Sequence, residues 1–193
     1  MDAPVVPLEG CCTLWTGVLV HREDFDENGE IGVVQIRDID AEGRLLTPLD
    51  RVRLGSGVSE RQFLRDGDVL LKGRGSRMTA AHIEKAPAGT IATSAYFVLR
   101  AKSNVLPGFL AWYLNNARLP VMQSMTMKLL HLKDLRGVPV HLPEIEVQQQ
   151  VIDAHRLIEE ARRLSDRYHR RIGQLLRGAV FNSAVNRVGG RQA

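Results

Sequence analysis

Residues 144–182 read EIEVQQQVIDAHRLIEEARRLSDRYHRRIGQLLRGAVFN, and this stretch decides the fold. It contains no proline, and apolar or small residues recur every third and fourth position, which is typical of an amphipathic helix. At about 1.5 Å per residue such a helix measures roughly 60 Å, about twice the diameter of a small domain. We therefore expect a helix over 144–187 that cannot lie wholly against the preceding residues and needs a partner.

The helix carries an apolar seam. Counting in sevens places small and apolar residues in two columns, as at the a and d positions of a coiled coil. Small residues let two helices approach closely, and the larger ones supply apolar contact. Pairing two identical antiparallel helices about a two-fold axis is the simplest way to bury such a stripe. The predicted interface of this homodimer consists of Val151, Ala154, Ile158, Ala161, Ser165, Tyr168, Ile172 and Leu175.

The composition fits one folded domain followed by an appendage. The chain has 193 residues, 44% of them hydrophobic, which is enough for one core. It holds no apolar run long enough to cross a membrane, and its first residues lack the features of a signal peptide, so we expect a cytoplasmic protein without a membrane partner. Cys11 and Cys12 have no further cysteines with which to form a disulfide framework or a zinc site, and we expect reduced thiols.

The positive charge is concentrated in the middle of the chain. Residues 51–140 carry 14 basic and 5 acidic side chains, a net charge of +9, although the whole chain has a net charge of only +4. Lysine and arginine displace the counterions that condense on a polyanion, so this segment favours nucleic acid as a partner. A solvated surface with chance clustering of charge explains the composition equally well.

Two short segments concentrate basic residues. The first is a glycine-rich loop after a short apolar strand, in which Gly73 and Gly75 allow close approach of the backbone to another surface. It lacks the final residues of a P-loop and the third glycine of a dinucleotide fingerprint. A tight hairpin with incidental basic residues remains the alternative. The predicted nucleic-acid-binding residues are Lys72, Arg74 and Arg77 in this loop, and Lys128, His131 and Lys133 in the second segment.

The rest of the chain predicts a mixed α+β domain over 1–143. Runs of β-branched and apolar residues predict strands, and Pro107 predicts a helix start. We expect strands at 13–20, 31–39, 51–54, 69–71 and 137–140, a strand pair or one long strand at 90–100, and helices at 107–116 and 119–130. The tail at 188–193 is expected to fray.

No catalytic constellation is visible. The six histidines show neither a metal-binding spacing nor cysteine partners, so we expect no metal and no cofactor. Ser56 and Ser76 lie in glycine-rich sequence without forming a nucleophile elbow. Asp66 and Asp68 are more simply read as a turn before a strand than as a nuclease site. The chain is therefore not expected to be an enzyme, and any chemistry resides in another chain.

The order of these elements resembles a known family. The resemblance covers about residues 13–182 and is to one target-recognition domain plus one spacer helix of the DNA specificity subunit of type I restriction-modification systems. The motifs that carry it are Gly67-Asp68-Val69-Leu70-Leu71 with Arg74-Gly75-Ser76, Ile91-Ala92-Thr93 leading to Phe97-Val98-Leu99-Arg100, Leu106-Pro107, Leu110 to Asn115, Leu132, Leu135, and Val138-Pro139-Val140 to Leu142-Pro143 before a glutamine-rich helix start.

The resemblance implies a DNA-reading domain at 1–143, an antiparallel spacer helix at 144–187, and the tail at 188–193. It further implies a methyltransferase subunit, and sometimes a restriction subunit, as partners. Family members usually carry two such halves, so this chain resembles a half-size form, and Glu146-Val147-Gln148 stands where the family has Glu-Gln. The alternatives are a recognition module of another modification or phage-defence system, and a helical interaction scaffold that binds no DNA.

Overall fold

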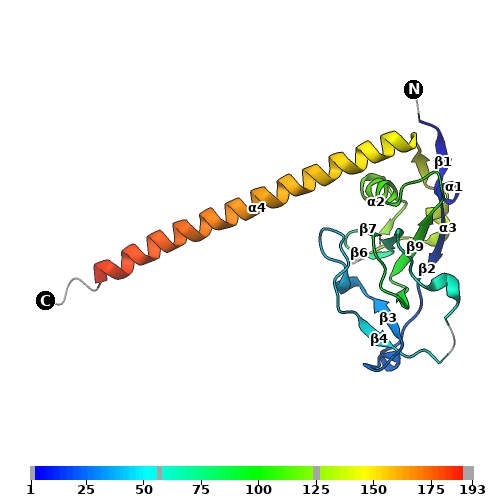
Figure 1. Ribbon diagram of the computed structural model, residues 1–193, viewed down its shortest axis with the longest axis horizontal. Helices are drawn as coiled ribbons and strands as arrows, with labels where there is room; N and C mark the ends of the chain where they lie inside the picture. Colours follow the sequence, from blue (N-terminus) through cyan, green and yellow to red (C-terminus); the bar gives the residue numbers. More distant parts are fainter. Residues whose placement is uncertain (1–2, 56–57, 124–126, 189–193) are drawn as a thin grey trace. The chain divides into compact units, whose positions relative to one another are not determined.

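The computed structural model describes residues 3–55, 58–123 and 127–188, with side chains to residue 178 except at Gln123. The chain forms two compact units, Met1–Ile152 and Asp153–Ala193, which are described separately here. The fold is mixed α+β with a long C-terminal helix, as predicted (Figure 1). Over the described residues, no helix is long and apolar enough to span a bilayer.

A four-stranded antiparallel sheet forms the centre of the first unit. Its strand order is β2-β9-β5-β7, and helix α2 packs against β5 and β7 (Figure 1). The elements are β2 (Cys12–Thr16), β5 (Asp68–Lys72), β7 (Ala80–Ile83), β9 (Tyr96–Ala101) and α2 (Pro107–Asn116). The predicted helix at 107–116 is thus confirmed, with Pro107 in its first turn.

This sheet is buried on both faces. Successive side chains of a strand point to opposite faces, so Val69 and Leu71 join the core beneath α2 whereas Leu70 joins a second cluster on the other face. Phe97 and Val98 of β9 divide in the same way. The uninterrupted apolar runs in β5 and β9 follow from this two-sided burial.

Three smaller sheets complete the unit. One has the order β4-β3-β8, another pairs β1 with β12, and the third has the order β10-β11-β6. Their strands are β1 (Val5–Pro7), β3 (Ile31–Val34), β4 (Asp50–Val52), β6 (Arg74–Gly75), β8 (Thr90–Ala92), β10 (Met122–Gln123), β11 (Lys128–Leu129) and β12 (Pro139–His141). The short helices α1 (Leu8–Cys11) and α3 (Leu132–Arg136) contact each other, and 3₁₀ turns occupy Arg22–Asp24, Ile36–Asp38 and Glu60–Gln62.

Several predicted strands end early. The strand expected at 13–20 stops at Thr16, because Gly17 passes directly against the carbonyl of Thr93 and the chain then bridges to β8. The strand expected at 31–39 stops at Val34, because the Asp38 carboxylate accepts the N–H of Gln35 at 2.8 Å and closes a 3₁₀ turn. The segment 90–100 is a pair of strands, β8 and β9, which lie in different sheets.

The predicted helix at 119–130 is wrong. Residues 122–123 and 128–129 form β10 and β11, which pair antiparallel with Met122 opposite Leu129. Pro120 lacks a backbone N–H and disfavours helical geometry in the residue before it, whereas β6 offers β11 a strand partner. Leu130 then enters the main core, and its N–H donates to Gly73 O at 2.9 Å.

Helix α4 (Ile145–Val188) begins one residue after the predicted start. Its first two turns belong to the first unit, where Ile152 packs against Gly108 at the start of α2. The division between the units therefore falls inside the helix, after Ile152.

Candidate nucleic-acid interface

The sheet β10-β11-β6 brings together the two basic segments that the sequence singled out. Gly75 lies opposite Lys128, and Arg74 lies opposite Leu129, in antiparallel register. The hydrogen bond from Leu130 N–H to Gly73 O extends this pairing by one step. Residues of the glycine-rich loop and of the segment at 128–133 are thus neighbours in space, although β7, β8, β9, α2 and β10 lie between them in the sequence.

Gly73 and Gly75 of the loop are each required for a different structural reason. A Cβ on Gly73 would lie 2.9 Å from Cε2 of Phe97, so a side chain there would collide with the core. Gly75 has φ +136°, a conformation that other residues rarely adopt. A Cβ on Gly75 would also lie 3.0 Å from Cε and 3.2 Å from Nζ of Lys72. The ammonium group of Lys72 therefore lies beside Gly75, over the sheet.

The remaining predicted residues flank this sheet. Arg77 is exposed in the loop after β6, His131 is half-buried at the N-cap of α3, and Lys133 is exposed within α3. The structure therefore brings Arg74 and Lys128 together through strand pairing, with Lys72 of β5 beside Gly75, and places the other three in adjoining segments.

The basic residues of this surface have no counterions among the described residues. Within 3–55, 58–123 and 127–188, no ion pair or side-chain hydrogen bond engages Lys72, Arg74, Arg77, Lys128 or Lys133. Elsewhere in the domain, many cations are neutralised by neighbouring carboxylates. These pairs include Arg37 with Asp50, Arg44 with Asp40, Arg53 with Asp26, and Lys85 with Asp66. The unpaired cations leave positive charge for an external anion to neutralise.

Sequence reasoning missed the apolar residues of the same sheet. Met122 and Leu129 are 57% and 39% exposed, and Met127, just before β11, is also exposed. The pattern gave no signal for them because the segment was predicted to be a helix rather than two paired strands. They make the surface mixed, with exposed apolar side chains beside unpaired cations.

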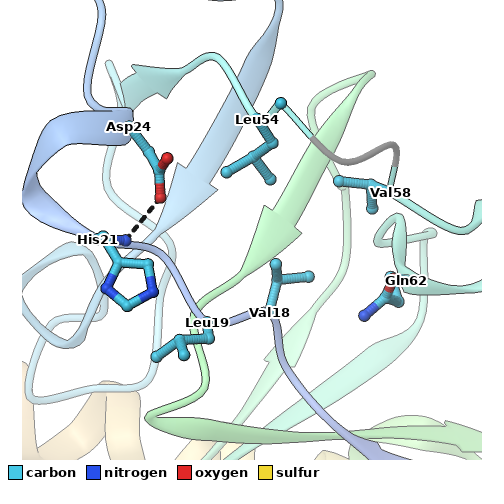
Figure 2. A pocket seen from close by; sticks show the side chains of 8 residues that line it. Val18, Leu19, His21, Asp24, Leu54, Val58 and Gln62 are labelled. Atoms are coloured by element: carbon cyan, nitrogen blue, oxygen red, sulfur yellow. Dashed lines mark hydrogen bonds between the residues drawn. The ribbon is translucent and has the colours of Figure 1, made fainter.

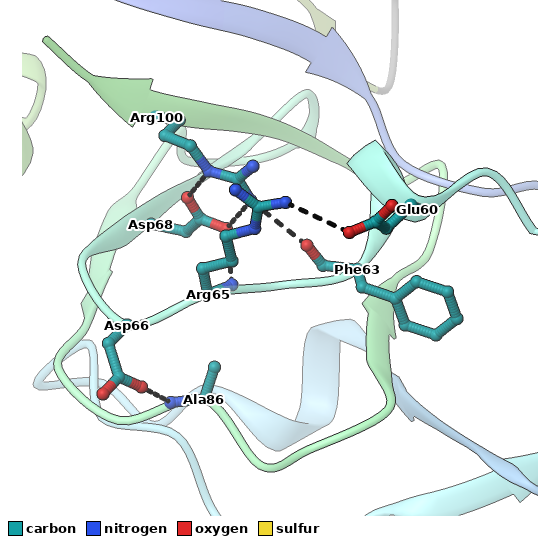
Figure 3. Close-up of polar contacts among 7 residues, drawn as sticks. All are labelled: Glu60, Phe63, Arg65, Asp66, Asp68, Ala86 and Arg100. Atoms are coloured by element: carbon teal, nitrogen blue, oxygen red, sulfur yellow. Dashed lines mark hydrogen bonds and ion pairs between the residues drawn. The ribbon is translucent and has the colours of Figure 1, made fainter.

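Asp66 and Asp68 have structural roles. Figure 3 shows Asp68, which is buried, held by two hydrogen bonds of 2.8 Å from the guanidinium of Arg100 and by one from the N–H of Arg65. Asp66 accepts from Lys85 Nζ at 2.6 Å and from the N–H of Ala86 at 2.9 Å. The hydrogen bond from Lys85 is the main reason that the pKa of Asp66 is lowered.

Nor do the described side chains assemble a metal site or a reactive thiol. No group of three or more histidine, cysteine, aspartate or glutamate side chains within the described ranges could hold a metal ion. Cys11 and Cys12 are buried and free. Burial raises the pKa of Cys12 to about 12, and the neighbouring Cys11 adds to this shift.

Figure 2 shows a surface pocket of about 380 Å³ in the first unit. The Asp24 carboxylate at its rim accepts the backbone N–H of His21 at 2.7 Å and so closes a local turn. The described lining consists of Val18, Leu19, His21, Asp24, Leu54, Gly55, Val58 and Gln62, and includes none of the predicted site residues.

The second unit exposes an apolar helix face. The predicted seam residues from Ala154 to Leu175 are exposed, whereas Val151 lies in the first unit and packs, partly buried, against its core. Leu157, Leu164 and Leu176 are also exposed and were not predicted. At about 100° per residue they flank the seam, so the apolar face is wider than two columns of a heptad.

Comparisons with known proteins identify the fold. No family model and no curated protein match the sequence. Among solved structures, the HsdS subunit from Thermoanaerobacter tengcongensis matches at 18% identity with a TM-score of 0.63, covering 83% of this chain and 38% of that one. A chain from work on complex assembly and conformational transition of the type I R-M system matches at 21% identity and TM-score 0.63, covering 83% and 39%.

The type I restriction-modification S subunit from M. genitalium matches at 9% identity and TM-score 0.52, with 83% of this chain and 40% of that chain covered. The chain thus spans about two fifths of the length of the structures that it matches. The likeness at these identities is one of fold, and it agrees with the predicted resemblance: the chain has the fold of one half of a type I restriction-modification S subunit.

Proposed function

We propose that this chain is a half-size specificity subunit that binds double-stranded DNA in a sequence-specific manner. The observation that carries the proposal is the β10-β11-β6 sheet, which brings Arg74 and Lys128 together beside Lys72 of β5, with no counterion for any of the three among the described residues. Such cations release counterions from DNA when they contact phosphates. The shared fold with solved S subunits supports the same function.

The C-terminal helix is proposed to pair with the same helix of a second copy, running antiparallel. Its exposed apolar face is the support, since an apolar stripe of this width is normally buried against another element. Such a dimer carries two identical reading domains related by a two-fold axis. The preferred DNA is then an interrupted palindrome, with a spacing set by the length of the helix.

The dimer is proposed to dock a methyltransferase subunit, and in some assemblies a restriction subunit, which supply the chemistry in the cytoplasm. The chain itself contributes recognition and spacing and needs no cofactor. A pull-down of the tagged chain from its native host tests this part of the proposal. Recovery of a methyltransferase supports it, and recovery of a different modification or defence enzyme favours the recognition module of another system.

DNA binding is tested by titrating labelled duplexes with the full-length protein at salt concentrations between about 50 and 200 mM, because each neutralised phosphate contributes about 0.9 to the slope of log affinity against log salt. We expect a steep slope that becomes shallower in the triple variant Lys72→Ala, Arg74→Ala, Lys128→Ala. The matched control, Arg44→Ala, Arg53→Ala, Lys85→Ala, removes the same charge from paired positions.

The control is expected to retain most of the wild-type slope, because its cations are already neutralised by carboxylates. Equal reductions of the salt slope in the two variants would mean that DNA binding depends on net charge alone and not on the positions of the cations. Wild-type protein that does not bind duplex DNA at low salt would favour the alternative function, a helical interaction scaffold that binds no DNA.

A further inference from the structure

The strand register separates the side chains of the β10-β11-β6 sheet onto two faces. Residues directly opposite each other in an antiparallel pair share a face, and successive residues alternate. Met122 lies opposite Leu129, and Leu129 lies opposite Arg74, so these three side chains form one row on one face. Lys128, opposite Gly75, points to the other face.

The side chain of Lys72 also lies on the face that carries Lys128. The direction in which Gly75 would carry a Cβ leads to Cε and Nζ of Lys72, at 3.0 and 3.2 Å. Because Gly75 and Lys128 are directly opposite, the ammonium groups of Lys72 and Lys128 belong to the same face. Two like charges on one face repel each other in the free protein, and an anion placed beside them relieves that repulsion.

The two faces differ in chemistry. One carries two ammonium groups, which act as point charges and suit phosphate oxygens. The other carries a single guanidinium, whose fork matches the O6 and N7 acceptors of guanine, flanked by exposed apolar side chains that suit the methyl group of thymine. The major groove of DNA accommodates β-strands, and it displays both the guanine O6 and N7 acceptors and the thymine methyl group.

We infer that the row Arg74, Leu129 and Met122 reads base edges in the major groove, whereas Lys72 and Lys128 contact the phosphate backbone. This inference rests on the proposed function and deepens it by dividing the surface into base-reading and phosphate-contacting residues. Arg74 is assigned a guanine, and Leu129 and Met122 are assigned a thymine methyl group beside it.

The experiment begins with selection of bound sequences from a pool of duplexes with a randomised centre, using the full-length protein. In the selected duplex, each guanine is then replaced singly by 7-deazaguanine, which lacks the N7 acceptor, and each thymine by uracil, which lacks the methyl group. One guanine replacement is expected to lower wild-type affinity about tenfold. One thymine replacement is expected to lower it about fourfold, as loss of one buried methyl group implies.

The variants assign each effect to a side chain. Arg74→Met keeps an unbranched side chain but loses every donor, so we expect it to become insensitive to 7-deazaguanine. The double variant Leu129→Ala, Met122→Ala is expected to become insensitive to uracil. Lys72→Ala and Lys128→Ala are each expected to reduce the salt slope by about 1 and to select the same sequence as wild type.

Two matched controls test whether removal of a cation or of an exposed leucine elsewhere in the domain has the same effect. Lys85→Ala removes one cation that is already paired with Asp66, and Leu46→Ala truncates a leucine of similar exposure outside the sheet. Both are expected to retain the wild-type sequence preference and sensitivity to the modified bases. Thermal unfolding of each variant verifies that the exposed substitutions leave the domain folded.

The outcomes separate the two proposals. A wild-type protein that selects no sequence and binds no duplex overturns the proposed function and this inference together. A wild-type protein that selects a sequence, while Arg74→Met remains as sensitive to 7-deazaguanine as wild type, overturns the inference alone. The same holds if the lysine variants, rather than the row variants, change the selected sequence.

Discussion

The side-chain carbonyl oxygen of Gln148 accepts a hydrogen bond of 2.8 Å from the backbone N–H of Leu106, the N-cap residue of α2. The amide nitrogen of Gln148 donates to the carbonyls of Asn104, at 3.1 Å, and Pro143, at 2.9 Å. Gln148 is fully buried, so one side chain joins the start of α4 to the loop that precedes α2.

Replacing Gln148 with leucine is expected to lower the free energy of unfolding by about 3 kcal/mol, because the buried backbone groups lose their partners. Gln150→Leu is the matched control: it makes the same change two residues away, at an exposed position, and should lie within about 0.5 kcal/mol of wild type. Denaturant unfolding followed by circular dichroism measures both. Equal stability of the two variants would contradict a structural role for the Gln148 amide.

The pair formed by Asp68 and Arg100 gives a second prediction. Asp68 is buried and Arg100 mostly so, with the guanidinium also 5.0 Å from the centre of the Trp15 ring. Arg100→Met leaves a buried carboxylate without its partner and is expected to cost about 3 to 5 kcal/mol of stability. Lys85→Met breaks the exposed pair with Asp66 and should change stability far less. Similar losses in both variants would show that burial does not set the strength of these pairs.

The cysteines give a third prediction. Because burial raises the pKa of Cys12 to about 12, its reactive thiolate is scarce at neutral or mildly alkaline pH. The pKa of Cys11 is raised for the same reason. Native protein at about pH 8 should therefore react slowly with a disulfide reagent such as Ellman's reagent, whereas both thiols should react rapidly after unfolding in guanidinium. Rapid reaction of the folded protein would contradict the buried positions of these residues.

Local signals were enough to predict several elements. Pro107 fixes the start of α2, and the proline-free apolar repeat predicts the start of α4 to within one residue. The strands β5 and β9 are also evident, because burial on both faces demands continuous apolar runs. In each case, the information lies within the segment itself.

Non-local pairing explains what the sequence did not reveal. The segment at 119–130 has apolar residues that suit either a helix or strands, and the outcome depends on β6, far away in the chain. The same pairing places Arg74 and Lys128 on opposite faces, although both were predicted simply as basic site residues. Val151 fits the heptad seam, but its contact with the first unit's core depends on the packing of the first turns of α4.

Self-association through α4 gives the fourth prediction. Ile172 is exposed on the apolar face, so a glutamate there places a charge in the proposed helix contact and should shift the protein from dimer to monomer. Gln174→Glu introduces the same residue two positions away, on the opposite face at about 100° per residue, and should leave the dimer intact. Sedimentation velocity distinguishes the protomer mass of 21.5 kDa from twice that value. Wild-type protein that sediments at the protomer mass throughout the micromolar range, or a dimer that Ile172→Glu leaves unchanged, would show that this face is covered by something other than a second copy.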